Sequence, residues 1–124
     1  MLPGLIGDML AGAGGGPCTF SGSFTLDGSP PVVVSGPYSI TVPAGNTGDI
    51  QLKNQVETGA VVFEYSKNGG AYTNGEPNPT AIAMANGDTL TLRISGAGSG
   101  EQIAFDIYDV TFSSTIESVV ISST

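Results

Sequence analysis

From Pro17 onward, apolar and polar residues alternate with a period of two, in short runs that end at glycine, proline or asparagine. The clearest run places Leu90, Leu92 and Ile94 on one parity, with threonine and arginine between them. Because successive side chains of a strand point to opposite sides of a sheet, this alternation is typical of a strand with one buried face. We therefore expect the chain to fold into sheets.

Turn signals divide the pattern into about eight to ten short strands, a spacing that is typical of a sandwich or barrel. The Asn-Gly pairs at 68–69 and 86–87 are the strongest signals, because both residue types tolerate the positive φ of a tight turn. The sequence predicts an all-β, antiparallel β-sandwich. Its expected strand segments are 18–26, 38–42, 50–52, 61–66, 71–73, 80–84, 89–94, 101–112 and 118–122.

The segment 101–112 changes parity midway. Its first apolar residues, ending at Ile107, have odd numbers, whereas Tyr108, Val110 and Phe112 have even numbers. A β-bulge near residues 107–108 would carry the later side chains to the other face. A strand that crosses between sheets, or one buried on both faces, is the alternative.

The first sixteen residues, MLPGLIGDMLAGAGGG, combine apolar side chains with a glycine run. They lack the basic start of a signal peptide and are shorter than the roughly 20 apolar residues of a membrane span. We expect this apolar tip to dock on a partner, the alternative being a frayed or self-packed terminus. The expected partner-binding residues are Met1, Leu2, Leu5, Ile6, Met9 and Leu10.

Two parts follow from these patterns. We expect an N-terminal docking arm and glycine hinge at residues 1–16 and a β-sandwich domain at 17–124, with the pattern clearest over 37–122. Residues 17–34 belong either to the sandwich or to a longer arm that pairs with a partner's sheet edge.

The composition removes several kinds of site. The chain has no histidine, no tryptophan and one cysteine, Cys18, which we expect to pack as a small buried hydrophobe. An imidazole base, a Cys-His pair and an intramolecular disulfide are excluded. With 11 acidic and three basic residues and a net charge of −8, the chain also lacks the cationic cluster that nucleic acid or an anionic membrane requires. We expect no enzyme activity, no cofactor, no nucleic acid and no membrane partner.

Carboxylates remain as candidate chemical groups. Glu101, Asp106 and Asp109 lie close in sequence, but the two aspartates have opposite parity in a strand unless a bulge realigns them. We expect them to be solvated surface, as most carboxylates are. The oxygen ligands that calcium prefers have no EF-hand spacing here, and we expect no metal site. Those calcium candidates are Asn46, Asp49, Asn86, Asp88, Asp106 and Asp109.

A sugar-binding sandwich usually presents exposed aromatic rings. Tyr38 and Tyr65 share parity with core positions, which leaves Tyr72 as the candidate for surface ligand contact. The alternative for Tyr72 is a cross-strand packing partner at its hairpin.

The stretches FEYSKNGGAYTN (63–74), PTAIAMANGDTLTLRIS (79–95) and ESVVIS (117–122) occur in that order. They resemble the immunoglobulin-like or fibronectin-like β-sandwich modules of tailed-bacteriophage virion proteins, over residues 37–122. The opening MLPGLIGD also looks like the start of short phage structural proteins. The Cys pair and Trp of antibody domains are missing, so the resemblance implies the disulfide-free form of an immunoglobulin-like sandwich.

The resemblance implies a virion protein, located on the capsid surface as a decoration or cement protein. We expect the arm to dock on the major capsid protein or another virion protein, and self-association, for example as a homotrimer, is compatible with this role. Two alternatives remain: a tail, neck or head-fibre component, and a secreted or surface carbohydrate-binding or adhesion module.

Overall fold

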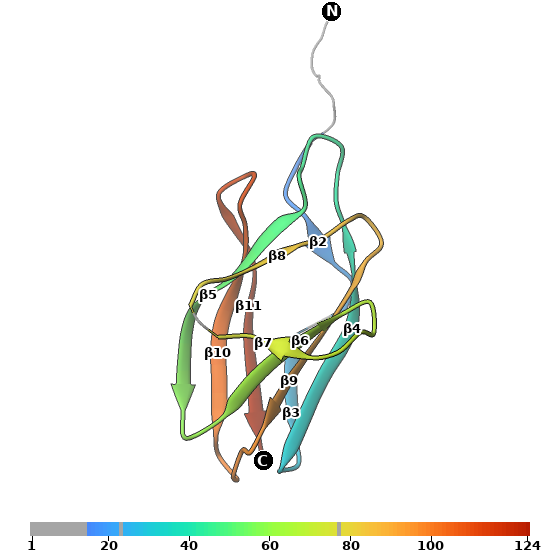
Figure 1. The fold of residues 1–124 in the computed structure, drawn as a ribbon. Helices are drawn as coiled ribbons and strands as arrows, with labels where there is room; N and C mark the ends of the chain where they lie inside the picture. The colour runs from blue at the N-terminus through green and yellow to red at the C-terminus, as the bar shows by residue number, and fades with distance from the viewer. Residues whose placement is uncertain (1–14, 23, 77) are drawn as a thin grey trace, which may run out of the picture.

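The computed structural model describes residues 15–22, 24–76 and 78–124, and in this part every regular element is a β-strand. Two five-stranded sheets face each other (Figure 1). The first has the order β3 (Thr25–Gly28), β11 (Ser114–Ser123), β10 (Gln102–Asp109), β5 (Asp49–Thr58) and β8 (Thr80–Ala83). The second has the order β2 (Thr19–Phe20), β4 (Val32–Thr41), β9 (Thr89–Ser95), β6 (Val62–Lys67) and β7 (Thr73–Asn74). The predicted all-β sandwich is confirmed.

Seven of these strands have the arrangement of a constant-type immunoglobulin domain, in which strands A, B, E and D face strands G, F and C. Strands β2, β4, β9 and β6 occupy the first four positions, and β11, β10 and β5 the other three. Their chain order also runs from A to G. Strands β3, β7 and β8 are additions at the sheet edges. Because β3 pairs in parallel with β11, one sheet is mixed, where the sequence predicts only antiparallel pairs.

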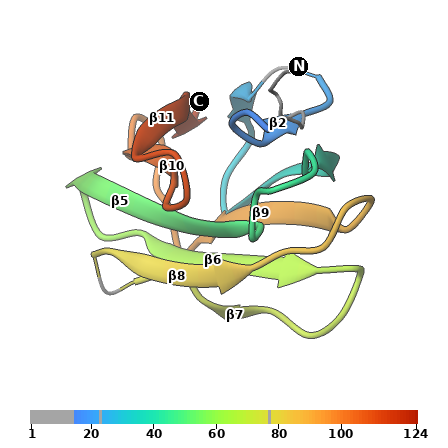
Figure 2. The same cartoon turned by 90° about the horizontal axis from the view of Figure 1, so that it is seen from above.

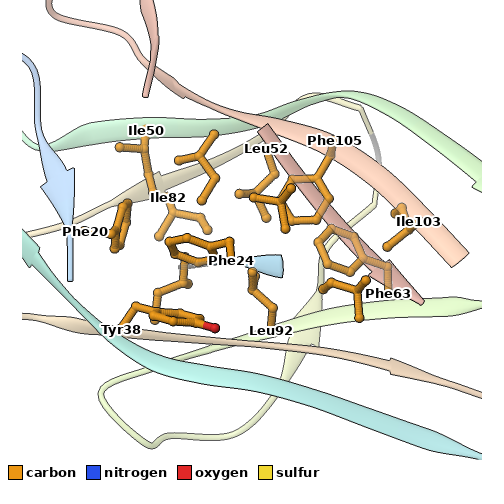
Figure 3. Packing of buried hydrophobic residues seen from close by; sticks show 14 of the residues in the cluster. Phe20, Phe24, Tyr38, Ile50, Leu52, Phe63, Ile82, Leu92, Ile103 and Phe105 are labelled. Atoms are coloured by element: carbon orange, nitrogen blue, oxygen red, sulfur yellow. The ribbon is translucent and has the colours of Figure 1, made fainter. Parts of the chain in front are cut away.

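Inward-facing side chains fill the space between the sheets (Figure 3). Phe63 of β6 and Phe105 of β10 come from opposite sheets, and their ring centroids lie 4.8 Å apart. All three apolar residues of β9, at 90, 92 and 94, are fully buried, as the alternation predicts. Burial of these side chains from both sheets is the main force that holds the two layers together.

The Asn-Gly pair at 68–69 forms the expected tight turn. Asn68 and Gly69 have φ values of 56° and 73°, and the amide of Gly70 donates to the carbonyl oxygen of Lys67 over 3.1 Å. The return strand β7 begins pairing only at Thr73, so the whole hairpin is wider than this turn.

Residues 19–20 and 25–28 pair within the sheets as β2 and β3, which assigns this part of 17–34 to the sandwich. Strand β4 begins at Val32, well before the expected start at residue 38. A register shift between Ser35 and Tyr38, with Gly36 at a φ of 112°, interrupts the alternation there. The first half of β4 has no simple period-two signal in the sequence, because exposed Val32 and Val34 flank buried Val33 and the next buried residue is Ser35.

The predicted change of face within β10 is wrong. Side chains of odd number remain inward up to Asp109, which is fully buried, whereas Tyr108 is half-buried and Val110 and Phe112 are exposed. The pairing of β10 with β11 does shift register between residues 107 and 108, but the extra residue is Ile116 of β11. Since the partner strand carries the bulge, β10 keeps its own period.

We expect Leu92→Ala to lower the free energy of unfolding by about 2–5 kcal/mol, because it leaves a cavity between the sheets. Val62→Ala is the matched control: this side chain is half-exposed on the outer face, and the loss should stay below about 1 kcal/mol. Urea titrations of both variants measure the difference. Equal losses would contradict the assignment of the inward face.

Candidate functional site

The described chain begins at one end of the sandwich, beside the β4–β5 loop and the β10–β11 hairpin (Figure 1; Figure 2 looks down on this end). We call residues 15–18 together with the loops 42–48 and 110–113 the arm root. These three segments are far apart in sequence, and polar side chains connect them. The arm root holds the start of the described chain against the end of the sandwich.

Asp109 is the centre of the arm root. It is the last residue of β10, its side chain is 0% exposed, and each of its oxygens accepts hydrogen bonds. The Cys18 amide donates to Oδ2 over 2.7 Å, and Asn46 Nδ2 donates to the same oxygen over 2.8 Å. The Phe112 amide donates to Oδ1 over 2.9 Å. One carboxylate thus joins the start of the described chain, the β4–β5 loop and the β10–β11 hairpin.

These donors determine the charge state of the site. Burial alone would raise the pKa of Asp109, but the hydrogen bonds from Cys18, Phe112 and Asn46 outweigh it and lower the pKa below its usual value. Burial and the nearby Asp109 carboxylate raise the pKa of the Cys18 thiol to about 11. At neutral pH the site therefore holds an ionised carboxylate beside a neutral thiol.

Asn46 connects Asp109 to the backbone of the arm. Its Nδ2 also donates to the carbonyl oxygen of Gly16 over 3.0 Å, and its Oδ1 accepts from the amide of Gly48 over 2.8 Å. Gly48 has a φ of 80°, and a Cβ there would lie 1.9 Å from the carbonyl oxygen of Met84, so this position requires glycine. The close approach of Gly48 to Met84 and the bond from its amide to Asn46 therefore hold the loop that carries Asn46.

A threonine pair closes the arm root on the other side. The hydroxyls of Thr47 and Thr111 lie 2.7 Å apart, and the Thr47 amide donates to Thr111 Oγ1 over 3.2 Å. Next to Thr111, the Phe112 ring lies against the start of the arm: a Cβ on Gly15 would be 3.1 Å from its Cζ atom. The two loops and residue 15 thus form one continuous surface.

The predicted site residues have different outcomes. Met1, Leu2, Leu5, Ile6, Met9 and Leu10 lie outside the described residues, so their partner-binding role stays a prediction. Tyr72 is half-buried, and the Arg93 guanidinium lies 3.7 Å from its ring centroid. Arg93 also pairs with Glu64 over 2.6 Å, so one face of the candidate platform is covered by a held side chain.

The three candidate carboxylates are not brought together. Glu101 precedes the opposite end of β10 and accepts hydrogen bonds from the amides of Gly98 and Ala60. Asp106 points to the outer face, where Asn54 Nδ2 and Ser118 Oγ donate to it, whereas Asp109 points inward. The expectation that Asp109 is solvated surface is wrong, because donors distant in sequence compensate its burial.

The calcium candidates are also dispersed. Asn46 contacts Asp109, and Asp49 Oδ2 accepts from the hydroxyl of Thr47. In the β8–β9 turn, Asn86 Oδ1 and Asp88 Oδ2 accept backbone amides, those of Val42 and Ala85. The backbone bond from Ala85 and a bond with the Asn68 side chain lower the pKa of Asp88. Among the described residues, no three acidic or cysteine side chains are grouped to hold a metal ion.

Comparison of the chain with protein-family models, with curated proteins and with solved structures gave no match. Within residues 15–124, apart from 23 and 77, no helix is long and apolar enough to cross a membrane.

The residues that form the arm root were visible in the sequence, but in other roles. Asn46 and Asp109 stand among the calcium candidates, and Val110 and Phe112 among the apolar residues that follow the change of parity in the segment 101–112. The remaining signal is the loop PAGNTG at 43–48, which has an asparagine between two glycines and no charge. Sequence reasoning missed the site because Asn46 and Cys18 lie 63 and 91 residues from Asp109 along the chain.

Asp109→Asn is expected to lower the free energy of unfolding at pH 7 by about 2–4 kcal/mol, because it removes a buried charge and sets an amide among donors. The lowered pKa of Asp109 gives the sign of the pH dependence. Its contribution is complete above about pH 4 and is lost as the pH falls through the pKa of the folded state. Urea titrations from pH 7 to pH 2 should therefore show the gap to the wild type closing in acid.

Asp106→Asn is the matched control on the same strand and should cost less than about 1 kcal/mol at pH 7. A gap between wild type and Asp109→Asn that stays constant down to pH 2 would contradict an ionised Asp109.

Cys18 should react slowly with iodoacetamide in the folded protein. At pH 8, a pKa of about 11 instead of 9.0 lowers its thiolate fraction about a hundredfold, and burial slows the reaction further. Mass spectrometry follows the alkylation, with the urea-unfolded chain as the reactive reference. Equal rates in the two states would show that Cys18 is not enclosed at the arm root.

Proposed function

We propose that this chain is a non-enzymatic docking module that attaches to a larger assembly through residues 1–14. Following its resemblance to phage virion modules, we assign it to the capsid surface as a decoration or cement protein. The observation that carries the proposal is the arm root, where buried Asp109 holds the start of the described chain against two loops. We assign a structural role to this site, since both carboxylate oxygens of Asp109 accept hydrogen bonds from donors within the chain.

A fixed origin favours attachment. The end of the arm at Gly16 and the adjoining Cys18 are already held by Asn46 and Asp109, so docking has less chain to order. The apolar side chains of residues 1–10 supply the binding energy. At about 25 cal/mol per Å2, a few hundred Å2 of buried apolar area gives several kcal/mol before ordering costs. Many copies on one particle would add avidity.

The charge of the chain is consistent with a protein partner. A net charge of −8 keeps a displayed domain soluble, and neither nucleic acid nor a membrane belongs to the proposal. The partner is the major capsid protein or a neighbouring virion protein. Self-association, for example as a trimer, fits the role without being required by it.

Deletion of residues 1–14 is expected to abolish co-sedimentation with particles while leaving the sandwich folded. Under this proposal, we expect a major capsid protein gene in the neighbourhood of this gene, and the particles for the test are assembled from that protein. A chain of full length with serine at positions 5, 6, 9 and 10 is the matched control for arm length, and it should also lose binding, because the apolar side chains carry the attachment. Circular dichroism and melting temperature show whether each variant is folded.

Undiminished sedimentation of the deleted chain would contradict the role of the arm. A gene position away from any virion gene would contradict the virion assignment. Retention of the wild type on a polysaccharide column, lost in Tyr72→Ala but kept after deletion of the arm, would establish the carbohydrate-binding alternative instead.

A further inference from the structure

The β10–β11 hairpin exposes two large apolar side chains at the arm root. Val110 is 41% exposed and Phe112 is 42% exposed. Both lie in the loop 110–113, a place where glycine, asparagine, aspartate and serine ordinarily predominate. Their presence there is not explained by the needs of the turn.

The other exposed valines have an ordinary explanation. They lie in strands β4, β5, β6 and β11, where β-branched side chains are favoured on a pleated surface. On the outer face of the sheet that contains β4, β9 and β6, the ion pair of Arg93 and Glu64 also interrupts the apolar surface, beside Val34 and Val62. The residues concerned are Val32, Val34, Val56, Val62 and Val120.

The backbone that carries Val110 and Phe112 is held in place. The Val110 amide donates to the carbonyl oxygen of Asp49 over 3.1 Å, and the Phe112 amide donates to Asp109. Between them, the Thr111 hydroxyl is bonded to Thr47. Because the loop is ordered before any contact, burying these two side chains against a partner costs little additional entropy.

Charge distinguishes this end of the domain. The loops 42–48 and 110–113 contain none of the chain's 11 acidic and three basic residues. The segment of 14 residues that precedes the described chain joins it at residue 15, against the Phe112 ring. The exposed apolar side chains of Val110 and Phe112 thus lie next to the start of the described chain, and the exposed carboxylate of Asp49 borders them.

We infer that Val110 and Phe112 form a second docking contact, on the same partner that receives the arm. This inference rests on the proposed function. The partner therefore presents an apolar surface next to the site that takes residues 1–14. Phe112 is the anchor, because aromatic side chains at the centre of an interface contribute most of the binding energy.

Val110→Ser and Phe112→Ser in the full-length chain test the inference, with Val120→Ser as the matched control. Val120 is 40% exposed, nearly the same as Val110, but it lies on the outer face of β11. Binding is measured as the concentration for half-saturation of the same particles that serve for the deletion of residues 1–14. Each hairpin variant should raise it about tenfold, whereas the control should leave it within about twofold. Val110→Ser leaves the three donors to Asp109 and the Phe112 ring against Gly15 in place, so its effect does not act through the bonds that hold the start of the described chain.

Wild-type binding by both hairpin variants, with loss of binding on deletion of residues 1–14, would overturn this inference and leave the proposed function standing. Failure of the wild type itself to bind would overturn both. Sedimentation velocity tests whether a second copy of this chain binds Val110 and Phe112 instead. If the wild type forms an oligomer that Phe112→Ser dissociates, the inference is overturned in favour of a self-interface. Melting temperatures within a few degrees of the wild type establish that the variants are folded.

Discussion

A buried, ionised carboxylate organises the end of this sandwich from which the arm extends. Asp109 lies at an inward position of β10, in line with Ile103, Phe105 and Ile107, where an apolar residue would be the ordinary choice. Its burial is tolerated because two backbone amides and one side-chain amide donate to it. The requirement is mutual, since the same bonds hold the start of the chain and two loops together.

The strand arrangement makes this convergence possible. In the immunoglobulin-like order, the start of the first strand β2, the β4–β5 loop and the tip of the β10–β11 hairpin lie at one end of the molecule. The core that joins the sheets supplies the rigid frame, and the polar bonds at this end then fix one segment on it. A module that attaches by a terminal arm needs this combination, because a mobile origin would spend binding energy on ordering the chain.

The sequence predicted the elements that rest on local periodicity. Strand β9 and the turn at 68–69 follow directly from their residues. Alternation of apolar and polar residues is specific to a strand with one buried face, and an Asn-Gly pair favours a tight turn. The prediction for β10 was wrong at Asp109 and Val110, because the carboxylate is buried and the valine is exposed. Hydropathy does not predict this, since long-range hydrogen bonds compensate the burial of Asp109. The first half of β4 was missed because valines lie on both of its faces and a serine is one of its buried residues. The arm root could not be predicted for the same reason as Asp109: its donors are remote in sequence.

Amide hydrogen exchange at Cys18 and Phe112 tests the central claim most directly. Both amides donate to the Asp109 carboxylate, so two-dimensional NMR of the wild type at neutral pH should show exchange at least about a hundredfold slower than in an unfolded chain. In Asp109→Asn, the Cys18 amide should exchange faster while the amides of β9 remain protected. Exchange of Cys18 at the unfolded rate in the wild type would contradict a fixed origin for the arm.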